Sequence, residues 1–258
     1  FNAARLKSIS GREMEQGIAL AVFGVAGILF QMDGLAYTLA STSAFLTQGY
    51  CVFIPLWGLI IHRRHPSLKI YLSTLLVVVG VAVLAEINLH SFKLGRGEIE
   101  TLIASVLFTG QILLLENRRY AANRAGNFST VMFLTMSLLC VPLVWATAPG
   151  LAACWQAYST PTAGGLLAVL VVFCTVFAYT LMNRWQRHVT ATEAGLIYCI
   201  EPVVASVLAL FLPGWISHWG NLNYLDEQLT VRLLLGGGLI TAANLLLQSP
   251  WLEPRQEK

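Results

Sequence analysis

The chain contains 258 residues, of which 56 % are hydrophobic and 11 % are charged. Soluble globular domains carry about 25 % charged residues, so this composition excludes an ordinary water-soluble fold and indicates a protein embedded in lipid. The net charge of +3 says little by itself, but the distribution of the charges along the chain is informative.

Apolar segments of about 18–21 residues follow one another along the chain, and each is long enough to cross a hydrocarbon core of about 30 Å as an α-helix. Their length argues against a membrane β-barrel, whose strands are about 10 residues long and alternate in polarity. The expected fold class is therefore an all-α integral membrane protein with eight transmembrane helices. The predicted spans are 17–37, 42–61, 68–86, 99–116, 129–147, 163–182, 192–212 and 231–249.

Basic residues are distributed unevenly between the loops that join these spans. If the chain starts in the cytoplasm, three of the 16 Lys and Arg residues fall outside, namely Lys93, Arg96 and Arg232. This asymmetry follows the positive-inside rule. We therefore expect a multi-pass protein of a bacterial inner membrane with both chain ends in the cytoplasm. The inner residues are Arg5, Lys7, Arg12, Arg63, Arg64, Lys69, Arg118, Arg119, Arg124, Arg184, Arg187, Arg255 and Lys258.

Two stretches of the chain resemble each other at an offset of 147 residues. TSAFLTQGYCVFIPLWGLII (42–61) aligns with TATEAGLIYCIEPVVASVLAL (190–210), so that Pro55 falls on Pro202. By the charge distribution the first runs from outside to inside and the second from inside to outside. Such inverted repeats occur in many secondary transporters.

We therefore predict an inverted-repeat helical bundle with a first repeat at 1–92, which holds three helices, and a second at 93–258, which holds five. The symmetry predicts two further helices before Phe1, and hence ten in all. Gly80 and the glycines at 236–238 lie on the helix that ends each repeat, where they are expected to let helices approach closely.

The stretches GLAYTLASTSAFLTQGYCVFIPLW and TATEAGLIYCIEPVVASVLALFLP each contain a proline-bearing helix, and DEQLTVRLLLGGGLI adds an acidic turn and a glycine-bearing last helix. In these stretches the chain resembles EamA-type members of the drug/metabolite transporter superfamily. It departs from the family at HRRHPSLK (62–69), where an acidic turn is usual, and in the additional stretch 214–225. The resemblance implies ten helices, cytoplasmic ends, alternating access around a central cavity, and no metal or prosthetic group.

Glu201 lies near the centre of the span 192–212, which contains no Lys or Arg. A charge at the bilayer centre costs about 2.5–3.5 kcal/mol on insertion scales, and a carboxyl group without a basic partner tends to keep its proton there. Pro202 lacks an N–H and so frees the carbonyl of Tyr198, which lies on the same helix face as Glu201. We predict that Glu201 and Tyr198 bind substrate or couple protons; the alternative is a protonated glutamate that is bonded to a neighbouring helix.

Polar residues inside other spans are further candidates for the same role. Each suits either the lining of a cavity or an interhelical hydrogen bond. Glu193 instead fits a capping box with Thr190 at a helix start. The candidates are Thr175 and Tyr179 on one face of 163–182, Gln48 and Gln111 inside their own spans, and Asp33 toward the outer end of the first span.

These features favour a secondary transporter, and specifically an exporter, that moves small polar or amphipathic metabolites by alternating access, with Glu201 as a proton-coupling group. The alternatives are an integral-membrane enzyme acting on lipids and a non-transporting membrane subunit. The chain shows no phosphate loop, paired-histidine metal motif or serine triad signature, so we expect no enzymatic activity, cofactor or metal. The expected partners are a small-molecule substrate and the bilayer, and no nucleic acid is expected. The sequence does not decide between a monomer and a homodimer.

Overall fold

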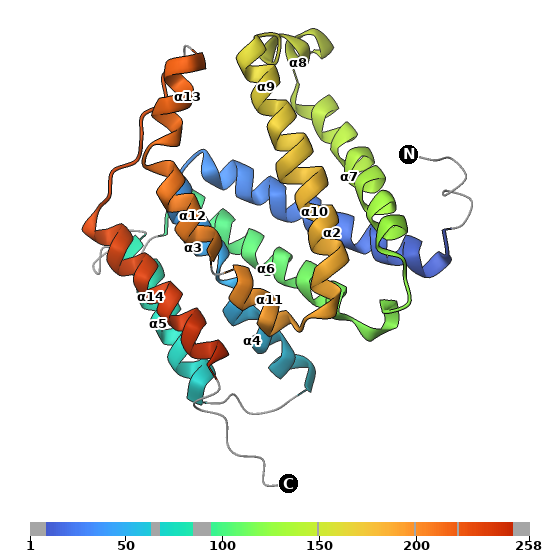
Figure 1. The fold of residues 1–258 in the computed structure, drawn as a ribbon, viewed down its shortest axis with the longest axis vertical. Helices are drawn as coiled ribbons and strands as arrows, with labels where there is room; N and C mark the ends of the chain where they lie inside the picture. Colours follow the sequence, from blue (N-terminus) through green and yellow to red (C-terminus); the bar gives the residue numbers. More distant parts are fainter. Residues whose placement is uncertain are drawn as a thin grey trace. The chain divides into compact units, whose positions relative to one another are not determined.

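The structure is a computed structural model that describes residues 9–62, 68–84, 94–148, 150–198, 200–220 and 222–249. Helices occupy most of this part of the chain, and no strand occurs in it (Figure 1). This confirms the expected all-α class. Several residues that the charge distribution relied on lie outside the described residues, namely Arg5, Lys7, Arg63, Arg64, Lys93, Arg255 and Lys258.

The helices follow one another with short connections. In chain order they are α2 (Gly11–Leu35), α3 (Ala40–Thr47), α4 (Tyr50–His62), α5 (Leu68–Leu84), α6 (Arg96–Glu116), α7 (Ala125–Thr147), α8 (Leu151–Ala157), α9 (Pro161–Val169), α10 (Ala178–Trp185), α11 (Ala191–Tyr198), α12 (Ile200–Ala209), α13 (Leu212–Gly220) and α14 (Val231–Gln248). A π-helical segment, Leu170–Phe177, joins α9 to α10. Short 3₁₀ turns lie at Arg118–Tyr120 and Gln186–His188.

Four of the described helices are long and apolar enough to cross a membrane: Gly11–Leu35, Arg96–Glu116, Ala125–Thr147 and the continuous segment Pro161–His188. A fifth span is formed if Glu193–Ala209 and Leu212–Gly220, which are bent by 49°, are counted as one. Two predicted spans, 68–86 and 231–249, are apolar helices of fewer than 18 residues by this measure, and 42–61 is divided between α3 and α4. The count of eight spans and the inverted repeat stay predictions.

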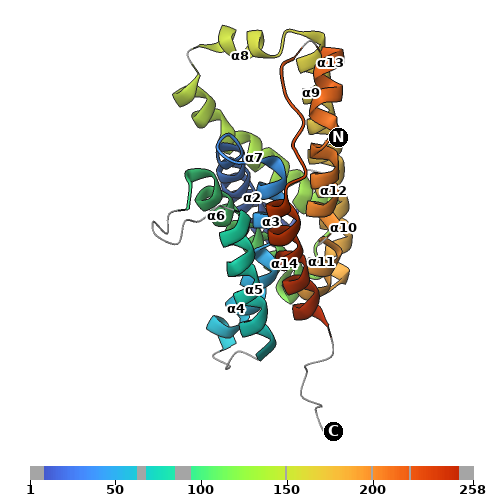
Figure 2. The same cartoon turned by 90° about the vertical axis from the view of Figure 1, so that its left-hand side faces the viewer.

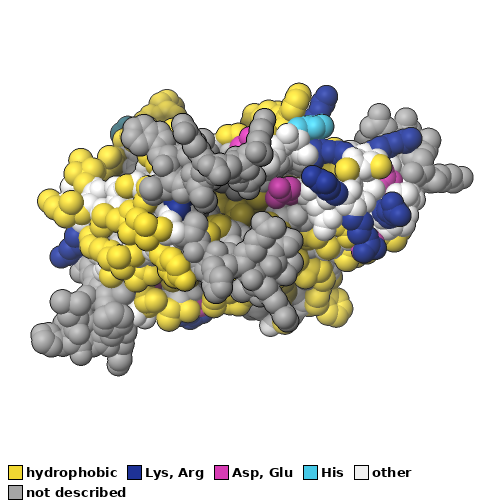
Figure 3. Space-filling model, turned by 90° about the horizontal axis from the view of Figure 1, so that it is seen from below, with side chains coloured by type: hydrophobic (Ala, Val, Ile, Leu, Met, Phe, Trp, Pro, Cys, Tyr) yellow, Lys and Arg dark blue, Asp and Glu magenta, His cyan; other side chains and the backbone are white. Residues whose placement is uncertain are grey.

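Apolar side chains cover much of the surface. Figure 3 shows them over a large part of the face that it draws. The most apolar span, Pro161–His188, has no buried residue within its most hydrophobic window, and large side chains such as Phe173 and Phe177 are exposed. A soluble monomer rarely exposes so large an apolar area, whereas a membrane helix meets lipid there.

The chain folds into two compact units, and each joins stretches that are distant in sequence. Unit 1 comprises 1–26, 110–190 and 219–221, and unit 2 comprises the remaining stretches 27–109, 191–218 and 222–258. The helices α2 and α6 contribute residues to both units. The predicted division into repeats between residues 92 and 93 concerns the sequence and stays a prediction.

Unit 1 is built around α2, α7, α10 and the last turns of α6. Its core contains Leu20, Leu115 and Phe128, together with Ala21 and Met132. At Gly17 a Cβ atom would lie 2.7 Å from the carbonyl oxygen of Phe128. The glycine therefore lets α2 approach α7 more closely than any side chain would allow.

Glu13 ties the start of α2 to the start of α7. Its carboxylate accepts hydrogen bonds from the Ser10 N–H at 2.8 Å, the Arg124 N–H at 2.9 Å and Asn127 Nδ2 at 3.0 Å. In return Ser10 Oγ accepts from the Glu13 N–H at 3.2 Å, which completes a capping box. Glu13 is 4 % exposed, so its carboxylate serves the free N–H groups of two helices at once.

The turn between α6 and α7 is fastened to α2 as well. Tyr120 donates its hydroxyl to Glu15 at 3.0 Å, and Arg119 forms an ion pair with the same carboxylate at 2.9 Å. Burial, reinforced by the bond to Glu15, raises the pKa of the Tyr120 phenol.

Unit 2 holds α3, α4, α5, α11, α12, α13 and α14, with α5 and α14 side by side in Figures 1 and 2. A Cβ atom at Gly80 would lie 2.9 Å from the carbonyl oxygen of Gly236, and one at Gly236 would lie 2.9 Å from that of Gly80. The predicted role of these glycines in close helix packing is thereby confirmed. Around them the core gathers Phe45, Leu46, Val52, Val77, Val81, Leu84, Leu233, Ile240 and Ala243.

Glu227, in the acidic turn before α14, caps a helix that is distant in sequence. Its carboxylate accepts from the Ala40 N–H at 2.8 Å and from both the N–H and the hydroxyl of Ser41, at the start of α3. The Glu227 N–H donates to the carbonyl of Ala209 at 2.9 Å, at the end of α12. One residue therefore joins α3, α12 and the approach to α14.

Replacement of Glu13 tests the connection between α2 and α7. We expect Glu13→Ala to lower the free energy of unfolding by about 1–3 kcal/mol, because buried donors lose their acceptor. Thermal unfolding of the purified protein in detergent measures the effect. Glu116→Ala, at an exposed acid that ends α6, is the control and should change stability by less than about 0.5 kcal/mol. Equal losses in the two variants would contradict the assigned role.

Candidate functional site

One helical segment of unit 2 is interrupted between α3 and α4, at Gln48 and Gly49, and a side chain from this break reaches Tyr198 in α11. Gln48 Nε2 donates a hydrogen bond to the carbonyl oxygen of Tyr198 at 2.8 Å. This is the carbonyl that Pro202 was predicted to leave without a helical partner, and Gln48 supplies the missing donor.

Both N–H groups of the Gln48 amide are engaged. Besides the bond to Tyr198, its Nε2 donates to the hydroxyl of Tyr50 at 2.9 Å, and the Cys51 sulfur lies 3.9 Å from its Oε1. The side chain is 0 % exposed. Of the two roles predicted for Gln48, the structure places it in interhelical hydrogen bonding, where it orients its neighbours.

Two tyrosines pack against each other beside this bond. The rings of Tyr50 and Tyr198 are edge to face, with centroids 6.2 Å apart, the geometry that aromatic quadrupoles prefer. Cys51 strengthens the same contact, since its thiol donates to the carbonyl of Gly195 at 3.6 Å. The start of α4 and the end of α11 are thereby held at three points.

Glu201 lies in the first turn of α12, three residues beyond Tyr198. Its side chain is exposed, and no hydrogen bond or ion pair to it occurs among the residues that the structure describes. Glu201 thus presents a carboxyl group next to an ordered pair of tyrosines.

The remaining candidates divide between the two units. Thr175, Tyr179 and Gln111 belong to unit 1, whereas Asp33 belongs to unit 2 with Gln48, Tyr198 and Glu201. Sequence reasoning treated them as one group. The structure joins Gln48 directly to Tyr198, and each of the others has its own surroundings.

Thr175 lies inside the π-helical segment, where its hydroxyl donates to the carbonyl of Leu170 at 2.9 Å. Such segments are rare and frequently mark functional sites. Tyr179 follows one turn later and packs edge to face on Phe133, with centroids 6.5 Å apart. Both side chains are half-buried, so they retain some accessible surface.

Gln111 is buried, and its Nε2 has no hydrogen-bond partner among the described residues. The amide lies against the backbone of α2, because a Cβ atom at Gly24 would be 3.1 Å from that nitrogen. Only a glycine leaves room for the amide there. A buried donor without an acceptor is uncommon, which keeps Gln111 a candidate for contact with a polar group.

Asp33 is held at the ends of α2 and α6. Its carboxylate forms an ion pair with Arg96, whose Nε donates to Glu100 at 2.7 Å and whose guanidinium lies 4.4 Å from the ring centre of Tyr37. These side chains make an exposed charged group. Its contacts assign Asp33 a position in this group, and any binding role stays a prediction.

Sequence reasoning missed two members of the site, Tyr50 and Cys51. The sequence signal that could have found them is the pair Gln48-Gly49, a polar residue and a glycine within an apolar run. Glycine weakens a helix interior, and an amide in a span needs partners. No group of three or more His, Cys, Asp and Glu side chains suited to a metal ion occurs in the described part of the chain.

Comparisons with known proteins address the family. Residues 5–85 match the model of the EamA-like transporter family. The chain is 21 % identical over 209 residues to an "uncharacterized transporter" of Archaeoglobus fulgidus, which covers 80 % of the chain and 63 % of that protein. A second "uncharacterized transporter" of the same organism is 24 % identical over 250 residues, 92 % of the chain and 77 % of that protein. The chain thus spans less than two thirds of the first relative.

A solved crystal structure shares the fold, with a TM-score of 0.60 at 14 % identity over 95 % of this chain and 77 % of that one. Fold similarity at this identity carries no function. The family match and the two relatives are consistent with an EamA-type transporter of the drug/metabolite transporter superfamily, which the chain resembles in sequence.

Proposed function

We propose that the protein is a secondary transporter that exports small polar or amphipathic metabolites by alternating access, with its substrate site beside the break between α3 and α4 in unit 2. The observation that carries the proposal is the bond between Gln48 and the carbonyl of Tyr198, with the carboxyl group of Glu201 three residues further on. In secondary transporters, discontinuous helices form the substrate and ion sites near the bilayer midplane.

The contacts between the two aligned segments are reciprocal, which supports the predicted inverted repeat. In the predicted alignment of the two repeats, Gln48 corresponds to Gly195 and Cys51 corresponds to Tyr198. The observed pairs are Gln48 with Tyr198 and Cys51 with Gly195. Such an exchange of partners is what a two-fold relation between two segments produces.

The chemistry of the site suits a substrate with an apolar body and a polar or cationic group. The half-buried ring of Tyr198, backed by the buried Tyr50, offers contact to an apolar or cationic group, and Glu201 offers a carboxyl group that can carry a proton or receive a positive charge. If a proton and a substrate compete for Glu201, release of one accompanies binding of the other. This coupling would let a proton gradient drive export.

Replacement of Glu201 tests the coupling. We expect Glu201→Ala to abolish proton-driven flux in proteoliposomes, and Glu201→Gln to abolish the dependence on the proton gradient while substrate exchange persists, because an amide cannot titrate. The assay uses the intact protein and a compound whose release rises in cells that overproduce it.

Glu193→Ala is the matched control, because Glu193 is an exposed acid in the preceding helix α11. It should keep most of the proton-driven flux. Equal loss of flux in the Glu193 and Glu201 variants, at equal amounts of folded protein, would refute the assignment of Glu201.

Replacement of Gln48 tests the connection between the break at Gln48 and Gly49 and Tyr198 in α11. We expect Gln48→Leu to lower the free energy of unfolding by about 1–3 kcal/mol, because the Tyr198 carbonyl and the Tyr50 hydroxyl lose a buried partner. Transport should slow as well, whereas its dependence on pH should keep its shape because Glu201 is unchanged. Thermal unfolding and flux at several pH values measure both effects.

Gln31→Leu is the control for this substitution. The Gln31 amide donates one bond, to Thr47 Oγ1 at 3.0 Å, from a half-buried position. Its loss should therefore disturb stability and flux less than the loss of Gln48. A Gln48 variant that behaves like the Gln31 variant in both measurements would rule out the positioning role.

A further inference from the structure

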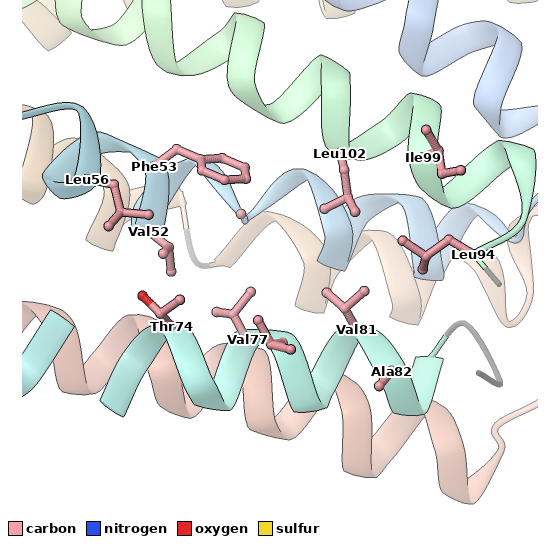
Figure 4. Close-up of a pocket in the computed structure, with 12 residues that line it drawn as sticks. Val52, Phe53, Leu56, Thr74, Val77, Val81, Ala82, Leu94, Ile99 and Leu102 are labelled. Carbon is pink, nitrogen blue, oxygen red and sulfur yellow. The ribbon is translucent and has the colours of Figure 1, made fainter. Parts of the chain in front are cut away.

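An apolar slot of about 650 Å³ lies in unit 2 between α4, α5 and the start of α6 (Figure 4). It touches the substrate site only at Gly49, and the transport proposal makes no use of it. Its walls are hydrocarbon, formed by side chains such as Phe53, Val77 and Leu102, and among its described lining residues the one hydrogen-bonding side chain is Thr74. The volume falls within the range of about 300–1,000 Å³ that is usual for ligand sites.

The slot is elongated along α5. In Figure 4 its lining runs from Thr74, opposite Val52 and Leu56, to Ala82 and Leu94 at the other end. At 1.5 Å per residue, the helix between Thr74 and Ala82 is about 12 Å long. Half of a hydrocarbon core of about 30 Å is about 15 Å, so the slot matches most of the depth of one leaflet.

The slot is open along one side. Val77 and Val81 are both 8 % exposed and form its floor, whereas Val78 and Ile99 at its rim are 58 % and 45 % exposed. Val78 shares α5 with other exposed apolar residues, such as Leu75 and Val79. A chain from the surrounding lipid could therefore enter sideways over α5.

The two ends of the slot differ in polarity. At the end near Leu94 and Ile99, the first turn of α6 carries Arg96, which holds Asp33 and Glu100 in an exposed charged group. The opposite end is apolar apart from Thr74, whose buried hydroxyl has no partner among the described residues. A polar end followed by an apolar length is the layout of a lipid, with its head group at the level of the charges.

A ligand rich in polar groups would gain little in this slot. Polar ligands are oriented by several placed donors and acceptors, and the described lining offers one hydroxyl. A hydrocarbon chain needs no such donor or acceptor, and its methylene groups can pack against the aliphatic side chains that line the slot.

We propose that this slot binds one acyl chain of a membrane phospholipid, with the phospholipid head group at the level of the charged group that Arg96 forms with Asp33 and Glu100. The site is independent of the transport proposal, since it involves neither Glu201 nor Gln48. A phospholipid would then be a bound component of unit 2, with one acyl chain between α5 and α6.

Photocrosslinking tests the proposal on the intact protein. The probe is a phosphatidylcholine that carries a diazirine in one acyl chain, added to the protein in nanodiscs and followed by peptide mapping. We expect the label on peptides from α4, α5 and the start of α6, and we expect Val81→Phe to reduce it roughly tenfold or more, because the larger side chain occupies the slot. Leu102→Phe, from the opposite wall, should have the same effect.

The control is Val79→Phe, the same change on the same helix at a residue that is exposed and does not line the slot. It should leave labelling of α4 and α6 unchanged. Thr74→Val should keep or increase the label, because a hydrocarbon chain makes no use of the hydroxyl. Label spread evenly over the exposed helices of the wild type, equal label in the Val79 and Val81 variants, or loss of label in Thr74→Val would each overturn the proposal.

Discussion

The hydrogen bond from Gln48 to the carbonyl oxygen of Tyr198 is the interaction on which the candidate site depends. A backbone carbonyl without a partner is costly in lipid, where no water can replace the missing bond. Pro202 removes the N–H that would serve this carbonyl, and an amide from another helix supplies it at 2.8 Å. The proline and the glutamine therefore act as a pair, since either alone would leave a buried polar group unsatisfied.

The sequence predicts the helices and their close approaches better than their interruptions. Apolar length is enough to place α2, α6 and α7, and glycine is enough to predict the contact between Gly80 and Gly236, because both follow from what lipid and backbone sterics permit. The break at Gln48 and Gly49 escapes hydropathy, since the run 42–61 stays apolar through it. The π-helical segment before α10 has no composition of its own and depends on local packing.

The candidate site could be predicted only in part for a related reason. Tyr198 and Glu201 follow from the proline and from the rarity of a carboxyl group in an apolar run, and both are properties of a single helix. Tyr50 owes its place to a bond with Gln48 and to the ring of Tyr198. Partners between helices depend on the fold, and the unpaired amide of Gln111 likewise becomes visible only when its neighbours are known.

The surroundings of the acidic residues distinguish Glu201 from Glu13, Asp33 and Glu227. Glu13 accepts three hydrogen bonds, Asp33 is paired with Arg96, and Glu227 caps α3. Each of these carboxylates joins separate helices. Within the described residues Glu201 has no such bond, although the structure around it is ordered by Gln48. A carboxyl group that holds no neighbouring helix, beside side chains that are held in place, is suited to bind a proton or a substrate reversibly.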